Sequence, residues 1–176
     1  MADLLTHVLV AYVLLTVAGW WVDWLDRRWV VVGMGGACIP DLQKVDILLD
    51  ADAVSAALGI PFTYSVTSTL GGVLLLSGAI TLLFERRWWR RVYTLLLAGG
   101  LAHVALDGLR VWADGRASQW LFPVFPSYRP PTPSLYVTSD PLVPVAAIAV
   151  SLLVFAVDRR RDVNADATAP TGHAEE

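Results

Sequence analysis

The sequence has a single cysteine, Cys38, which excludes an intramolecular disulfide and a metal site built from paired cysteines. It also lacks an excess of basic residues, because 13 lysines and arginines face 16 aspartates and glutamates. Nucleic acid is therefore not an expected partner. Charged residues make up 16% of the chain and hydrophobic residues 56%. A chain of 176 residues cannot bury that much apolar surface in one small soluble core, so we expect a protein integral to a membrane and surrounded by membrane lipid.

Five apolar runs are candidates for membrane-crossing helices. About 20 residues of helix cross the roughly 30 Å of hydrocarbon, and most of the runs approach that length. The first run has no basic N-terminal region and no convincing small-residue cleavage site, so we interpret it as a retained span. The second run is short, is loosened by glycines and stops at Pro40. The runs cover residues 4–21, 29–39, 67–84, 92–106 and 141–157.

Basic residues follow the first, third and last runs. If the chain crosses at every run, all three basic clusters fall on one side, which the positive-inside rule makes cytoplasmic. A re-entrant loop at 29–39 is the alternative, but it would place the basic residues at 86–91 outside. The sequence thus predicts an all-α fold: a polytopic helical membrane protein with about five transmembrane helices, the second of them short. We expect it to be multi-pass in the cell membrane, with the N-terminus outside and the C-terminus cytoplasmic.

The connections between the runs have patterns of their own. Residues 45–60 mix apolar positions with three aspartates, which suits a short helix lying in the membrane interface. Residues 108–141 are rich in proline and aromatic residues and could cap a site. Residues 162–176 are small and polar, which is typical of a disordered end. We therefore expect a transmembrane helical domain over residues 1–161, with an outer-side site, and a disordered cytoplasmic tail over residues 162–176.

Polar residues within the apolar runs fall near one end of the predicted bundle. Such groups are costly in a membrane unless they pair, bind a ligand or line a polar cavity. His103 and Asp107 are four residues apart, so they share a helix face and either bind one divalent metal or pair with each other. His7 and Asp41 fall at a similar depth, and two imidazoles with one or two carboxylates match catalytic zinc. Water on such a metal ionises near neutral pH and attacks ester, phosphoester or amide bonds.

Five short motifs follow one another along the chain: Thr6-His7, Ile39-Pro40-Asp41-Leu42-Gln43-Lys44, Leu70-Gly71-Gly72, Ala102-His103-Val104-Ala105-Leu106-Asp107 and Phe122-Pro123-Val124-Phe125. Their order and spacing resemble the membrane-bound metal-dependent hydrolases, the family that includes the LexA-binding inner-membrane protein. The resemblance runs from His7 to about Pro126. It implies a helical membrane protein that holds a divalent metal, zinc, and hydrolyses an ester-like bond in a lipid-like substrate. By position, the residues that match the family's catalytic and metal-ligating residues are His7, Asp41, His103 and Asp107.

Two positions depart from the family's pattern. Ser68 stands where members usually have a histidine, and Gln43 stands where many have a second acid. The hydroxyl of Ser68 is a much poorer zinc ligand than an imidazole. Asp46 could replace the acid missing at Gln43 only if its loop folds back. No Gly-x-Ser-x-Gly surrounds Ser68, so we expect it to cap the helix that begins at Thr69 rather than to act as a nucleophile.

Three functions remain open from the sequence. The first is a hydrolase that uses metal-activated water at the outer leaflet. The second is a non-catalytic membrane protein of the same fold whose metal site is degraded or structural. The third, a proton-coupled or ion-conducting transporter, also explains polar groups at depth, but the sequence shows no internal repeat that would supply an inverted pair of broken helices.

Overall fold

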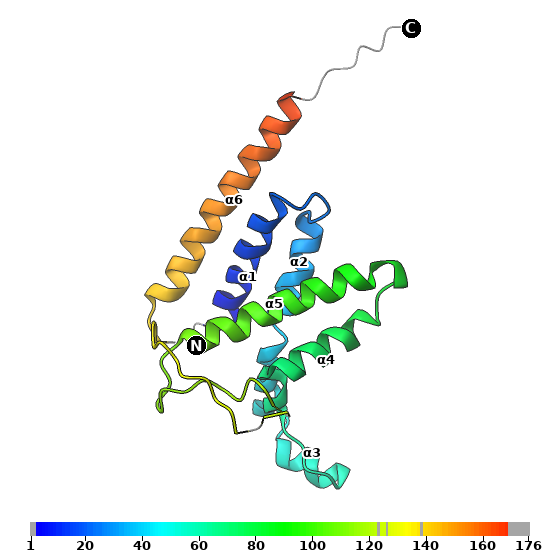
Figure 1. Cartoon of the computed structure of the whole chain (residues 1–176), viewed down its shortest axis with the longest axis vertical. Coiled ribbons are helices and arrows are strands. Elements are labelled where there is room, and N and C mark those ends of the chain that lie inside the picture. Colours follow the sequence, from blue (N-terminus) through cyan, green and yellow to red (C-terminus); the bar gives the residue numbers. More distant parts are fainter. Residues whose placement is uncertain (1–2, 123, 126, 138, 169–176) are drawn as a thin grey trace.

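The computed structural model is built from helices (Figure 1). It describes residues 3–122, 124–125, 127–137 and 139–168. Within these residues, pairing between extended segments is confined to two isolated bridges, so the all-α fold class is confirmed. Each of the five apolar runs forms a helix. The bounds are α1 (Asp3–Gly19), α2 (Arg27–Gly36), α4 (Leu70–Thr81), α5 (Trp89–Leu109) and α6 (Leu142–Thr168).

Helix α5 is the centre of the bundle and contacts α1, α2 and α4, while α6 lies along α1 (Figure 1). The contact between α2 and α5 depends on glycine. A Cβ atom added at Gly99 would lie 1.9 Å from the carbonyl oxygen of Gly33 and 2.8 Å from the amide nitrogen of Ala37. Because no side chain separates the two helices there, their backbones meet directly, as small residues allow in membrane helix pairs.

The lengths of the helices bear on the number of membrane crossings. Among the described residues, two helical segments are long and apolar enough to cross, Arg86–Leu109 and Leu142–Asn164. Helices α1 and α4 are apolar but shorter, and α2 has only 10 residues, or about 15 Å of helix. Five full-length spans are therefore more than the structure supports.

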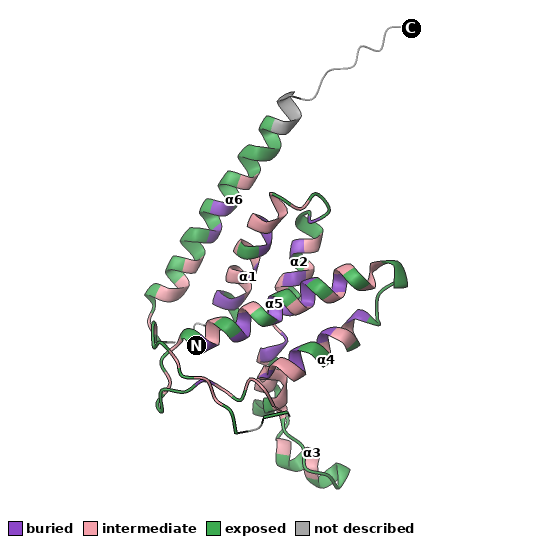
Figure 2. Ribbon diagram, in the orientation of Figure 1, coloured by how far each residue is buried: buried purple, intermediate pink, exposed green. Residues whose placement is uncertain are grey.

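Helix α6 presents its apolar side chains outward. In its most apolar window only 11% of the residues are buried, against 44% for the corresponding window of α5 (Figure 2). Leu152 and Leu153 are more than 60% exposed. An exposed apolar helix of this length is unfavourable in water and suits contact with lipid.

The three basic clusters of the sequence meet at one end of the bundle, which we call the arginine–tryptophan end. The guanidinium of Arg27 at the start of α2 donates to the carboxylate of Asp158 in α6 at 3.2 Å. Arg91, near the start of α5, covers the rings of three tryptophans that come from the α1–α2 turn, from α2 and from the segment before α5. Those rings belong to Trp24, Trp29 and Trp88, with their centroids 5.0–5.7 Å from the guanidinium carbon.

The opposite end carries the long connections. Between α2 and α4 lie the 3-10 helix η1 (Pro40–Ile47), helix α3 (Ala51–Leu58) and the 3-10 helix η2 (Tyr64–Ser68). The predicted helix within 45–60 is thus present as α3, and none of its described residues is buried. The proline-rich segment after α5 is irregular. Its predicted capping loop includes Pro123 and Pro126, which lie outside the described residues.

Helix α6 also runs beyond the expected domain boundary. It continues to Thr168, so residues 162–168 of the predicted disordered tail are helical. The expectation of disorder remains a prediction for residues 169–176, which lie outside the described part of the chain.

The glycine contact between α2 and α5 generates a stability prediction. Gly99→Ala should lower the free energy of unfolding by about 1–3 kcal/mol, because the new methyl group meets backbone that cannot move aside. Gly35→Ala is the matched control, since an added Cβ there has nothing within 4 Å. Thermal unfolding of the detergent-purified variants measures both. Equal midpoints for the two variants would contradict the backbone contact.

Candidate metal site

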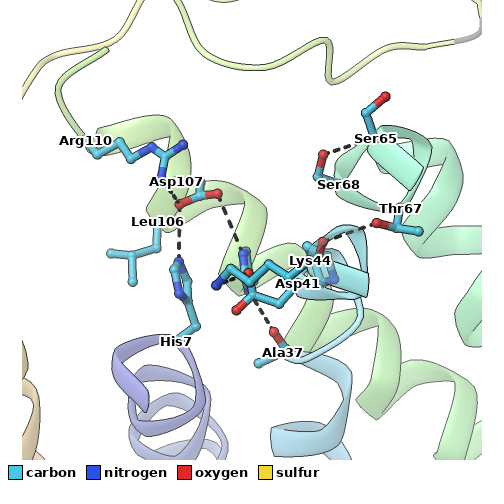
Figure 3. A network of polar contacts seen from close by, with 12 residues as sticks. His7, Ala37, Asp41, Lys44, Ser65, Thr67, Ser68, Leu106, Asp107 and Arg110 are labelled. Carbon is cyan, nitrogen blue, oxygen red and sulfur yellow. Dashed lines mark hydrogen bonds and ion pairs between the residues drawn. The ribbon is translucent and has the colours of Figure 1, made fainter. Parts of the chain in front are cut away.

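Three ligand-type side chains from distant parts of the chain meet at the end of the bundle opposite the arginines (Figure 3). His7 comes from the first turns of α1, and His103 and Asp107 come from the last turns of α5. One ligand atom from each of the three lies within 4.8 Å of the other two. We call these residues the metal cluster. All three residues of the metal cluster are among the four ligands predicted from the sequence.

The carboxylate of Asp107 faces the Nε2 atoms of both imidazoles. Its Oδ1 is 3.4 Å from Nε2 of His7, and its Oδ2 is 3.7 Å from Nε2 of His103. The two rings stack with centroids 3.6 Å apart and planes inclined by 12°. Both histidines are buried, and the side chain of Asp107 is 15% exposed. Water therefore has little access to the three groups.

A backbone carbonyl fixes the orientation of His103. Its Nδ1 lies 2.7 Å from the carbonyl oxygen of Ala37, just beyond the end of α2. A carbonyl can only accept a hydrogen bond, so Nδ1 carries the proton and donates it. The neutral ring then keeps its lone pair on Nε2, which is the nitrogen nearest to Asp107. This arrangement is the one in which a histidine serves as a metal ligand, with its other nitrogen held by a second partner.

The cluster fits a cation. An Nε2 lone pair and a carboxylate oxygen repel each other at close range unless a positive charge lies between them. A proton on one imidazole meets this requirement, and so does a divalent ion held by all three groups. Two nitrogens and one carboxylate oxygen are the donor set of many catalytic zinc sites, which keep a further position open.

Two residues near the cluster were not found from the sequence. The guanidinium of Arg110 approaches Oδ1 of Asp107 at 3.5 Å and lies 3.9 Å from the ring centroid of Trp112. The indole nitrogen of Trp112 donates to the carbonyl oxygen of Asp107 at 3.0 Å. Arg110 follows Asp107 by three residues, a spacing that could have indicated an ion pair at the end of the helix. It places a fixed positive charge beside the cluster.

The structure does not bring Asp41 into the metal cluster. Its carboxylate accepts a hydrogen bond from Nζ of Lys44 at 2.7 Å within η1 (Figure 3). The side chain is only 10% exposed, so the ion pair is largely shielded from solvent. The predicted fourth ligand therefore has a different partner in this structure. Asp46 also lies apart from the cluster, since its Oδ1 accepts from the amide of Ala51.

Ser68 lies in η2, and its hydroxyl donates to the carbonyl oxygen of Ser65 at 2.9 Å (Figure 3). The expectation that Ser68 caps α4 is wrong by one residue. Thr69 is the N-cap, and its Oγ1 accepts from the amide of Gly72 at 3.0 Å. Thr69 occupies the extended backbone conformation from which a hydroxyl reaches the first free amides of a helix, whereas Ser68 is already within a helical turn.

Comparison of the chain with protein-family models, with curated protein sequences and with solved structures finds no match. The class of the protein is therefore defined by its own fold and site. The described part of the chain is helical and has two helices long and apolar enough to cross a membrane. Two buried histidines and a half-buried aspartate form a group that could hold a metal.

The geometry predicts unequal roles for the two acids. Asp107→Asn should lower zinc affinity by about tenfold or more, because it removes the carboxylate beside the two Nε2 atoms. Asp41→Asn should leave zinc affinity close to that of the unmodified protein, because Asp41 pairs with Lys44. Zinc titration of the purified variants, read by competition with a chelating dye, measures both. An equal loss in the two variants would place Asp41 among the ligands.

Proposed function

We propose that this chain is a multi-pass membrane protein that binds a divalent metal, zinc, through His7, His103 and Asp107 and hydrolyses an ester or phosphoester bond. The observation that carries the proposal is the hydrogen bond from His103 to the carbonyl of Ala37, which leaves Nε2 available as a ligand beside a buried carboxylate. The resemblance of the motifs to the membrane-bound metal-dependent hydrolases agrees with it.

The placement of charge supports the proposed membrane topology. All three basic clusters gather at the arginine–tryptophan end, while the metal cluster lies at the other end of α1 and α5. Five crossings give this asymmetry, with the arginines cytoplasmic and the metal cluster toward the outer side. Because α2 is short, the backbone of η1 would then lie at membrane depth. This arrangement requires a locally thinned bilayer or protein that surrounds the polar backbone of η1.

The residues of the site would divide the chemistry among them. A divalent ion held by the cluster supplies Lewis acidity and makes water nucleophilic near neutral pH. Asp107 offsets the positive charge of the site and would supply the carboxylate ligand beside the two Nε2 atoms. Arg110, held against Trp112, is placed to attract the negative charge of a phosphoester or of a developing oxyanion. Stacked, buried rings keep the ligand atoms in place without large rearrangement.

A second candidate is a non-catalytic protein of the same fold with a structural metal. It is favoured by the Asp41–Lys44 pair and by the hydrogen bond of the Ser68 hydroxyl to Ser65 within η2, because neither residue contributes to the cluster. The two candidates agree on metal binding and differ on turnover.

The variant His103→Ala tests whether the metal cluster binds a metal or only stabilises the fold. The variant should lose about one zinc per chain, measured by elemental mass spectrometry, together with turnover on ester and phosphoester substrates. His173→Ala is the control, because His173 lies in the tail outside the described residues. Metal bound to the unmodified protein without turnover on any substrate would favour the structural alternative. Metal retained after loss of His103 would contradict the proposed site.

Cysteine labelling tests the topology. In a Cys38→Ala background, one cysteine is placed at Gln43, after Asp41, and another at Arg87, between α4 and α5. Five crossings predict that an impermeant reagent added to intact cells labels the first position and not the second. Labelling of both positions from one side would contradict the proposed topology.

A further inference from the structure

Two neighbouring hollows lie beside η2 on the side of the bundle formed by α4. One is a polar cavity of about 470 Å³, lined by Gln43, Ser65, Ser68, Gln119 and Arg129 among others. The other is an apolar groove of about 780 Å³, whose walls include Phe62, Leu75 and Leu76. Three residues, Thr63, Val66 and Phe122, line both hollows, so the polar cavity and the apolar groove adjoin each other. Each volume is within the range of small-molecule sites.

The one charge among the described lining residues of the polar cavity is paired with a carboxylate outside the lining. Arg129 is the ionisable group there, and its guanidinium is paired with the carboxylate of Asp114 and donates to the carbonyl oxygen of Ala117 at 2.8 Å. The Arg129 hydrogen bond holds the pKa of Asp114 below its usual range, so the pair stays charged and mutually neutralised. The remaining polar lining consists of hydroxyls, two carboxamides and the indole of Trp112. These groups exchange hydrogen bonds with hydroxyls and offer no free charge to a phosphate.

The walls are held in place from both sides. The amide of Leu70 at the start of α4 donates to the carbonyl oxygen of Trp120 at 3.0 Å, which ties the loop after α5 to this helix. Thr67 donates to the carbonyl oxygen of Pro40 at 3.2 Å, which ties η2 to η1. A Cβ atom added at Gly72 would lie 2.0 Å from the carbonyl oxygen of Val66, so η2 lies directly on α4. The hollows are therefore part of the folded structure, as ligand sites usually are.

We propose that this double hollow binds a lipid with an uncharged polyol headgroup, such as an acylglycerol or a glycolipid. The headgroup hydroxyls lie in the polar cavity, and one acyl chain follows the apolar groove along α4. A polar cavity whose arginine is already paired, next to an apolar groove, matches the two halves of such a lipid. The site rests on the membrane topology proposed above but not on the metal, because no residue of the metal cluster lines either hollow.

Photo-crosslinking in lipid nanodiscs tests the site. The probe is a monoacylglycerol with a diazirine near the end of its chain, and the comparison probe is lysophosphatidylglycerol with the same chain. The acylglycerol should crosslink to the groove segments at residues 61–76 and at Phe122 at least about fivefold more than the charged probe. Chelator-treated protein should give the same yield, which separates this site from the metal proposal.

Two variants of neighbouring leucines complete the test. Leu75→Ala removes part of the groove wall and should lower the crosslinking yield about threefold or more, whereas Leu74→Ala, outside the lining, should leave it unchanged. Both side chains are substantially exposed, at 74% and 44%, so neither change should prevent folding. Equal yields from the two probes, indicating a nonspecific lipid contact only, would overturn the proposal. Equal effects of the two variants, or crosslinks away from the groove, would overturn it as well.

Discussion

The site depends on one constraint, the direct backbone contact between α2 and α5. Because Gly36 and Gly99 carry no side chains, the end of α2 comes close enough to α5 for the carbonyl of Ala37 to accept the Nδ1 proton of His103. That single hydrogen bond fixes the tautomer and the ring orientation of a buried histidine. The stacking of His7 and the position of Asp107 then follow from the packing of α1 against α5. A change in the helix contact would therefore alter the metal cluster without touching a ligand.

The molecule separates its charges along the bundle. Arginine guanidiniums at one end interact with carboxylates and tryptophan rings, and they link the turn after α1, the start of α5 and the end of α6. The other end carries buried polar groups, the 3-10 helices and the irregular segment after α5. In the proposed topology a hydrophobic slab lies between these ends. Such a slab excludes arginines from its centre and permits buried polar groups only where protein surrounds them.

Much of this could be predicted from the sequence, because apolar runs and a four-residue spacing report local structure directly. The helices and the His7, His103 and Asp107 group follow from such patterns. The partner of His103 could not be predicted, since a backbone carbonyl leaves no mark in the residue types. Depth and the motif resemblance predict Asp41 among the ligands, but Lys44 lies three residues away and is the partner of its carboxylate in the structure. The sequence predicts Ser68 as the cap of α4, but the next residue also carries a hydroxyl, and the backbone conformation makes Thr69 the cap.

X-ray absorption spectroscopy at the zinc edge of the purified, zinc-loaded protein tests the central claim most directly. The account predicts a first shell with two imidazole nitrogens and carboxylate or water oxygen at about 2.0–2.1 Å, with outer-shell scattering from the two rings. In His103→Ala protein the imidazole scattering should fall to one ring or disappear with the metal. A shell of oxygen alone in the unmodified protein, with no imidazole scattering, would contradict a metal site built on His7, His103 and Asp107.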